Sequence, residues 1–336
     1  MSDSMPVFVE EYLDSLHEKG RKPTTIKRYR YDLLDFLHWY EQNGSTLTYQ
    51  RWASLTDLDI TDFFDELIQQ RSYKIRTTRR VYSVLQQLAR FYIKKGQLQT
   101  HAILHYSQPE LILTPLKRSE WLSEKEADRL LSIVRSFEGL TDNQMKGRPM
   151  LIDRNEFMVH LFLHYGCSLH EVASLTTSDV RFERNELRIR SEKGISRIVR
   201  LSPEHKQLAY TYFKQIPEPV RPRLFSTDFF FVAFDFQRGT YRWSYEEDQP
   251  KRLTEIAIQK MIRTEVERAG LRKGLSAQQL RHTFILRMLM KGFDPFTLQQ
   301  QLGLKSALSF NRYLLTIELM TSEEKEELLS KKALDI

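Results

Sequence analysis

Two neighbouring stretches near the C-terminal end, LSAQQLRHTFILRML (275–289) and LQQQLGLKSALSFNRYLL (298–315), decide the predicted fold of this chain. Their apolar residues recur at helical spacing, so each stretch is expected to bury one helical face. The sequence just before them has the same pattern. Helices are therefore expected over 254–269, 277–291, 295–302 and 306–315.

Two further patterned segments lie upstream of these helices. In YGCSLHEVASLTTSDV (165–180), a turn separates a buried helix predicted over 157–165 from a short helix over 169–175. In SEKGISRIVRLS (191–202), polar and apolar residues alternate after the glycine, and alternation also marks 186–189. These two alternating runs predict two strands paired around a turn.

The first hundred residues are expected to form a small helical bundle, because they contain four apolar stripes at helical spacing, the last over 77–95. The following segment, HAILHYSQPELILTPLKRSE (101–120), contains Pro109 and Pro115 and no helical stripe, which is typical of an interdomain linker. The chain is thus predicted to be mainly α with a small β-sheet. Its parts are expected to be a helical domain over 1–105, a linker over 106–120, a second domain over 121–320 and a tail helix over 321–336.

The composition narrows the class of protein. Of the 336 residues, 41% are hydrophobic, which excludes a disordered chain. No run approaches the ~18 apolar residues of a membrane helix, and the N-terminus lacks the basic and apolar regions of a secretory signal. The single cysteine, Cys167, excludes an internal disulfide framework and a cysteine-based zinc cluster. We therefore expect a soluble intracellular protein without membrane contacts.

The positive charge is concentrated in the predicted helical bundle. The chain carries 51 Lys and Arg against 44 Asp and Glu, and residues 67–109 contain no acidic side chain. A second basic cluster begins near residue 22, where a helix N-terminus would also offer free N–H groups to phosphates. Clustered charge of one sign favours a polyanionic partner, although a solvated helix face is the simpler alternative. The candidate contacts are Lys22, Lys27, Arg28, Arg30, Arg71, Lys74, Arg76, Arg79, Arg80, Lys94 and Lys95.

The order and spacing of these segments resemble the tyrosine recombinase, or phage integrase, family over nearly the whole chain. KPTTIKRYRYDLLDFLHWY (22–40) resembles the entry to the family's core-binding domain, and WLSEKEADRLL (121–131) resembles the opening of its catalytic domain. The segments 165–180, 191–202 and 275–315 then follow in the family's order. The resemblance implies that two domains grip double-stranded DNA from opposite sides.

The resemblance also implies a reaction. In the family a tyrosine attacks a DNA phosphate and forms a covalent 3′-phosphotyrosyl link. Two arginines hold the nonbridging oxygens, a lysine on a β-turn protonates the leaving oxygen, and histidines assist. Because the guanidinium groups supply the electrostatic stabilisation, neither a metal nor a cofactor is expected.

Four positions keep the family's residue. Lys193 falls on the predicted β-turn, Arg281 and His282 fall in the family's His-x-Leu-Arg-His frame, and Tyr313 falls at the nucleophile's position. Taken alone, each has an ordinary alternative: a turn lysine, a structural arginine, a core histidine and a core aromatic. Within the motif, Lys193, Arg197 and Arg281 are expected to contact the DNA backbone.

Three other positions do not keep the residue that the family has there. Ser168 stands where the family has its first arginine, Gln278 where it has its first histidine, and Leu304 where it has its second. Matching anchors flank each loss, as Gly166 and Glu171 do around Ser168. A single preorganised donor is worth about 10²–10³ in rate, although such losses do not add. We therefore expect a recombinase fold with little or no strand cleavage.

The leading functional expectation is a sequence-specific double-stranded DNA-binding protein that acts as a transcriptional repressor of a prophage or mobile element. It would be found in the cytoplasm, associated with the nucleoid. A second possibility is an accessory subunit that pairs with an active recombinase through the tail at 316–336, for which a surface helix on its own chain is the simpler alternative. The main alternative is an atypical recombinase that cleaves through Tyr313 with a rebuilt site. The candidates for rebuilding it are Arg154, Arg197, Arg200 and His170.

Overall fold

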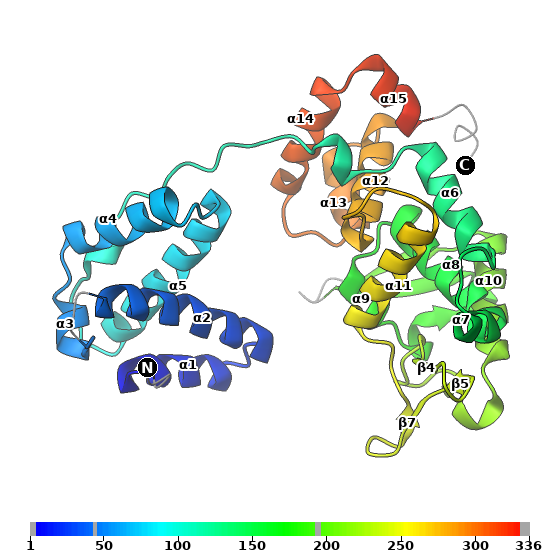
Figure 1. Ribbon diagram of the computed structural model, residues 1–336, viewed down its shortest axis with the longest axis horizontal. Coiled ribbons are helices and arrows are strands. Elements are labelled where there is room, and N and C mark those ends of the chain that lie inside the picture. The colour runs from blue at the N-terminus through cyan, green and yellow to red at the C-terminus, as the bar shows by residue number, and fades with distance from the viewer. Residues whose placement is uncertain (1–4, 43–45, 192–195, 330–336) are drawn as a thin grey trace. The chain divides into compact units, whose positions relative to one another are not determined.

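The computed structural model describes residues 5–42, 46–191 and 196–329, and the chain divides into two compact units, Met1–Ile112 and Leu113–Ile336. Each unit has its own hydrophobic core, and helices dominate both (Figure 1). The predicted class, mainly α with a small β-sheet, is confirmed. Among the described residues, no helix has the length and apolar character that a membrane crossing requires.

The N-terminal unit is a helical bundle whose core is rich in aromatic side chains. The apolar stripe of its last helix, which includes Val81, Leu88 and Tyr92, is buried against the first two helices. A capping box between Thr56 and Asp59 marks the start of one of its helices, at Asp57. Its elements are α1 (Val7–Glu18), α2 (Pro23–Glu41), α3 (Tyr49–Ala53), α4 (Asp57–Asp65), a π-helical turn (Glu66–Gln70) and α5 (Ile75–Lys94).

The boundary between the units lies within the segment predicted as a linker. Ile103 is buried in the N-terminal core, and the ring of Tyr106 stacks on Phe64 with 4.4 Å between the centroids. Leu116 is buried in a cluster of the second unit. Between these anchors, Leu111, Ile112 and Leu113 are exposed.

The C-terminal unit is built around α8, which is buried along most of its length. Helices α6, α10 and α12 pack on it (Figure 1). The helix predicted over 306–315 is a 3₁₀ turn (Ala307–Phe310) followed by α14. The helices are α6 (Glu124–Arg135), α7 (Asp142–Gly147), α8 (Ile152–Leu163), α9 (Leu169–Ala173), α10 (Pro203–Gln215), α11 (Glu255–Arg268), α12 (Ala277–Met290), α13 (Pro295–Gln301), α14 (Asn311–Leu319) and α15 (Ser322–Leu328).

A three-stranded antiparallel sheet accompanies these helices in the order β1-β2-β3. The two strands predicted from sequence are β2 and β3, which pair from Glu186 with Arg200 to Arg190 with Ser196. Two further pairs of short strands, β4–β5 and β6–β7, lie between residues 234 and 250. The strands are β1 (Val180–Arg181), β2 (Glu186–Arg190), β3 (Ser196–Arg200), β4 (Phe234–Asp235), β5 (Thr240–Tyr241), β6 (Trp243–Ser244) and β7 (Gln249–Pro250).

Gly166, in the turn between α8 and α9, brings the distant sequence motifs together. Its φ of +59° is in the left-handed region, and an added Cβ would lie 2.5 Å from the Phe284 ring and 2.8 Å from Leu302. Because only glycine fits here without strain, this turn can lie directly against α12 and the end of α13. The segments 165–180 and 275–315 therefore meet in one region of the C-terminal unit.

Candidate active site

The retained tyrosine and histidine lie against each other. Tyr313 on α14 contacts His282 on α12 in an edge-on arrangement, with 5.6 Å between the ring centroids. Burial raises the pKa of Tyr313, although Arg281 and Arg312 oppose this shift. The phenol is therefore protonated at neutral pH and would need a proton acceptor before it could attack a phosphate.

Arg281 shares one buried carboxylate with a second arginine. Its Nη1 donates to Oε2 of Glu171 at 3.2 Å, while Arg197 donates to both oxygens of the same carboxylate, at 2.5 and 3.1 Å. Burial alone would raise the pKa of Glu171, but the hydrogen bonds from Arg197 and its charge hold that pKa below the usual value. Glu171 is therefore an anion that fixes both guanidinium groups.

Arg197, which was expected to contact the DNA backbone, is buried and paired with Glu171. Its side chain is 5% exposed, and its Nη2 lies 4.0 Å from Sγ of Cys167, beside the place of the family's first arginine. The Arg197 guanidinium is already paired with the Glu171 carboxylate, because a buried arginine requires a counterion. This geometry does not support the expected contact between Arg197 and the DNA backbone.

Ser168, at the position of the missing arginine, caps a helix. Its Oγ accepts a hydrogen bond from the Glu171 N–H, and its own N–H donates to the Glu171 carboxylate at 2.7 Å. This reciprocal pair satisfies two backbone donors at the start of α9. The hydroxyl of Ser168 therefore has a structural role.

The other two changed positions also lie near the retained residues. The Gln278 amide is 3.3 Å from Nε2 of His282, whose Nδ1 lies 3.1 Å from the Glu120 carbonyl oxygen. A proton on Nδ1 would donate to Glu120 and leave Nε2 to accept from Gln278; burial lowers the pKa of His282, which favours this neutral form. Leu304 is half-buried and packs in an apolar cluster that also contains Tyr313.

Lys193, the predicted β-turn lysine, lies outside the described residues, between β2 and β3. Of the groups proposed to rebuild the site, Arg154 is buried and donates to the Val232 carbonyl oxygen, and His170 pairs with Glu255. Arg200 is exposed on β3. Among these four candidates, Arg197 alone shares Glu171 with Arg281.

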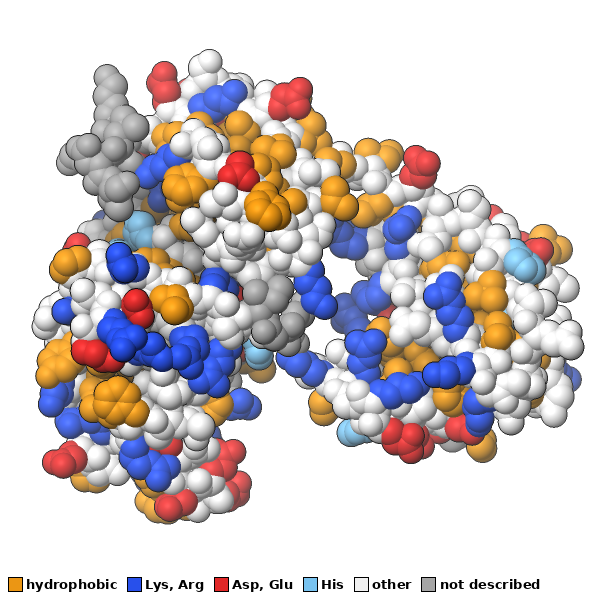
Figure 2. All heavy atoms as spheres, turned by 180° about the vertical axis from the view of Figure 1, so that it is seen from behind, with side chains coloured by type: hydrophobic (Ala, Val, Ile, Leu, Met, Phe, Trp, Pro, Cys, Tyr) orange, Lys and Arg blue, Asp and Glu red, His pale blue; other side chains and the backbone are white. Residues whose placement is uncertain are grey.

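The predicted basic contacts of the N-terminal unit fall into two groups. Lys22, Lys27, Arg28, Lys74, Arg76 and Lys94 are exposed, and Figure 2 shows Lys and Arg side chains gathered on the visible face of this unit. Five of the predicted cations are bonded inside the unit: Arg30 with Glu10, Arg71 with Asp35 and Glu66, Arg80 with Asp32, Lys95 with Glu11, and Arg79 with the Pro109 carbonyl oxygen. The window 67–109 has no acidic residue, but the fold supplies carboxylates from earlier helices.

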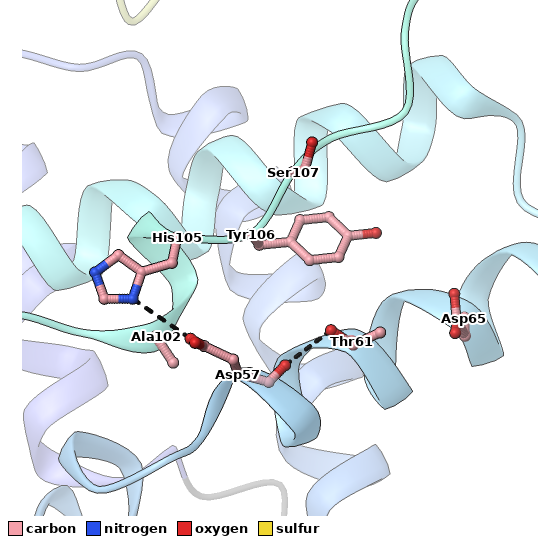
Figure 3. Close-up of a pocket in the computed structure, with 7 residues that line it drawn as sticks. All are labelled: Asp57, Thr61, Asp65, Ala102, His105, Tyr106 and Ser107. Atoms are coloured by element: carbon pink, nitrogen blue, oxygen red, sulfur yellow. Dashed lines mark hydrogen bonds and ion pairs between the residues drawn. The ribbon is translucent and has the colours of Figure 1, made fainter.

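A pocket of about 400 Å³ in the N-terminal unit is lined by none of these residues. Figure 3 shows His105 directed at Asp57, with Nδ1 and Oδ1 3.4 Å apart, and Thr61 donating to the Asp57 carbonyl oxygen at 2.8 Å. Asp65 adds a second carboxylate to its lining. The acidic lining makes this pocket unsuited to phosphate.

The ion pair between Arg197 and Glu171 gives a stability prediction. Arg197→Met is expected to lower the free energy of unfolding by about 3–5 kcal/mol at pH 7, because it leaves a buried carboxylate without its main counterion. The pKa of Glu171 is depressed in the folded state, so the pair's contribution is present above the usual value of 4.5 and is lost as the pH falls through the folded pKa. Chemical denaturation at several pH values should therefore show the difference shrinking in acid; a constant difference would contradict the assignment.

Comparison with known sequences identifies the family to which the chain belongs. The sequence model described as the phage integrase family matches residues 120–316, and that of the phage integrase N-terminal SAM-like domain matches residues 9–96. Together these matches span both units. The chain therefore belongs to the phage integrase family, whose members include the tyrosine recombinases.

Individual relatives and solved structures agree. The chain is 24% identical to the tyrosine recombinase XerD of Oceanobacillus iheyensis over 88% of this chain and 89% of that protein, and 26% identical to XerD of Pseudomonas putida over 88% of each. It shares its fold with the XerH site-specific recombinase bound to palindromic difH substrate in a post-cleavage complex (TM-score 0.66, 18% identity, 93% and 87% coverage). A lambda integrase dimer bound to a COC′ core site is also similar (TM-score 0.61, 13% identity, 94% and 96% coverage).

Proposed function

We propose that the protein binds particular double-stranded DNA sites through both units and leaves the strands intact. The observation that supports this most directly is the arrangement around Glu171, in which Arg197 is buried and Ser168 caps a helix. A phosphate beside Tyr313 would then meet one arginine, Arg281, where the family's reaction uses two. Removing one preorganised donor lowers the rate by a factor of about 10²–10³. Because two histidines are missing as well, the total loss of rate would exceed that factor.

The DNA partner is inferred from both charge and relatives. Exposed cations such as Lys27, Arg28, Lys74 and Arg76 can neutralise phosphates without breaking an internal ion pair. The structures of XerH and lambda integrase, which share the fold, were determined with those proteins bound to their DNA sites. Phosphate contacts of this kind position a protein, while a few base contacts specify the sequence.

A protein that occupies DNA sites without cutting them can act as a transcriptional repressor, and the family suggests a prophage or other mobile element as the setting. The curated relatives above are named as recombinases, so this regulatory role rests on the three changed positions, Ser168, Gln278 and Leu304. Its affinity would fall steeply with salt, because neutralised phosphates release counterions.

An active recombinase is the second candidate, and two observations favour it. Arg281, His282 and Tyr313 remain together, and Arg197 lies beside the place of the missing arginine. If DNA binding drew Arg197 from Glu171 to the phosphate, the second donor would be restored. The relatives' names also favour this candidate. It requires a covalent protein–DNA adduct on Tyr313, which the first proposal does not.

The tail gives less support to a third candidate, the accessory subunit. The described part of the tail packs on its own chain: Leu328 is buried beside Trp121, and Glu327 pairs with Arg118 at 2.9 Å. This arrangement matches the alternative of a surface helix. Pairing through the tail would need α15 to leave these contacts.

Tyr313→Phe tests binding separately from chemistry. The variant should bind a recovered DNA site within about twofold of the unaltered protein, because the Tyr313 hydroxyl has no hydrogen-bond partner among the described residues and the ring packing is kept. Fluorescence anisotropy with a labelled duplex measures this. A loss of more than tenfold in a correctly folded variant would show that the hydroxyl contributes to the complex.

A further inference from the structure

Three imidazoles gather where α8 ends and α10 begins, outside the family's site positions. His160 and His164 are four residues apart in sequence, and His205 lies in the first turn of α10. The Nδ1 atoms of His160 and His164 are 2.9 Å apart, and the ring centroids of His160 and His205 are 4.0 Å apart. One nitrogen from each of the three rings falls within 4.8 Å of the other two.

Two of the rings are oriented by neighbours on their other nitrogen. Nε2 of His160 lies 3.4 Å from the Glu156 carboxylate, and Nδ1 of His205 lies 2.7 Å from the Tyr165 hydroxyl oxygen. That oxygen also accepts a hydrogen bond from the Ser202 N–H at 3.1 Å. Metal-bound histidines usually have such a partner on the second nitrogen, which fixes the tautomer and the direction of the ring.

A simple stack of hydrogen-bonded histidines explains the geometry less well. The Glu156 carboxylate favours a proton on Nε2 of His160, so Nδ1 carries a lone pair toward Nδ1 of His164. Nδ1 of His160 is therefore available as a donor atom to an ion shared with His164, and one nitrogen of His205 lies within 4.8 Å of both rings' donor atoms.

We propose that His160, His164 and His205 bind a divalent transition-metal ion of the zinc class. Imidazole is a preferred ligand for such ions, and three protein ligands leave a fourth position for water. Metal–nitrogen bonds of about 2.0–2.1 Å place tetrahedral donors roughly 3.3 Å apart. The Nδ1 atoms of His160 and His164 are near this separation, and small rotations of the three rings would bring donors now within 4.8 Å of one another to it.

The bound ion would link α8 to α10, two helices that pack on each other although the three strands of the sheet separate them in sequence. His164 is followed at once by the Gly166 turn and by Ser168, so the ion would also steady the entry to α9. Its expected effects are a higher unfolding temperature and slower local opening of these helices. This site is independent of whether the protein cleaves DNA.

Metal titration of the full-length protein, purified without a polyhistidine tag and treated with a chelator, tests the proposal. Zn²⁺ in competition with a chromophoric chelator should show one site with a Kd in the micromolar range or tighter. His164→Ala and His205→Gln should each weaken that site at least 100-fold. His17→Ala is the matched control, because His17 is exposed on α1 in the other unit, and it should change nothing.

Two further readouts separate ligation from a loss of folding. Co²⁺ in the intact protein should give the visible absorption of a tetrahedral nitrogen site, and His164→Ala should abolish it while circular dichroism is unchanged. Tyr165→Phe should weaken Zn²⁺ binding by about 10-fold, since it removes the orienting partner of His205. The proposal would be overturned if the unaltered protein took no Zn²⁺ from the chelator. It would also be overturned if Zn²⁺ binding were equally strong in the unaltered protein, His164→Ala and His205→Gln.

Discussion

Lys74→Gln combined with Arg76→Gln is expected to weaken binding to a specific duplex about 10- to 100-fold near physiological salt. Both side chains are exposed at the start of α5, and neither has an ion-pair partner among the described residues. Each phosphate contact contributes about 0.9 to the slope of log affinity against log salt. The double variant should therefore reduce that slope by roughly 1.8, uniformly across DNA sequences.

The matched control is Arg30→Gln combined with Arg71→Gln, which removes the same net charge from the same unit. These arginines are paired with Glu10, and with Asp35 and Glu66. Their loss should lower the stability of the unit while the salt slope changes little. If both double variants reduced the slope equally, the division into exposed and internally paired cations would be wrong.

Ser168→Arg combined with Gln278→His and Leu304→His is expected to raise covalent adduct formation at least 100-fold over the unaltered protein. The three changes return one guanidinium and two imidazoles to the region of Arg281, His282 and Tyr313. Each preorganised donor contributes about 10²–10³ when the rest of the site is present. The loss of the Ser168 cap costs about 1 kcal/mol of stability, which a folded domain can tolerate.

Adding Tyr313→Phe to the triple variant should abolish the adduct, which identifies the nucleophile. Ser168→Ala is the control for the lost cap and should give no adduct. The assay is the retention of labelled DNA on denatured protein, with circular dichroism to check folding. If a folded triple variant that binds DNA stays as inactive as the unaltered protein, these three positions do not explain the lack of cleavage.

The sequence was sufficient for the architecture because helical periodicity and the ordered motifs act locally. The helix carrying Arg281 and the strands β2 and β3 lie where they were expected, and the helix carrying Tyr313 begins five residues later than expected, after a 3₁₀ turn. Helix α10 was missed although Ser202 as the N-cap, followed by Pro203, is a start signal. The β4–β7 hairpins could not be predicted, since each strand has only two residues and no alternation.

The site was less predictable because it depends on pairs of residues far apart in sequence. Arg71, just after the π-helical turn, meets Asp35 on α2, and Arg80 on α5 meets Asp32 on α2, so a local count of charges overstated the free cations. The burial of Arg197 against Glu171 likewise follows from tertiary packing. For the histidine cluster, the spacing of His160 and His164 was a visible signal, but its third member, His205, comes from another helix.

One measurement tests the central claim, that the protein binds DNA sites without cutting them. Purified protein is mixed with fragmented DNA from its source and recovered, and the bound DNA is sequenced before and after a hot detergent wash; Tyr313→Phe is treated in parallel. We predict that both proteins recover the same few sites and that the wash releases all of the DNA from both. DNA that survives the wash on the unaltered protein, and not on Tyr313→Phe, would show that phosphotyrosine chemistry persists and would establish the protein as an active recombinase.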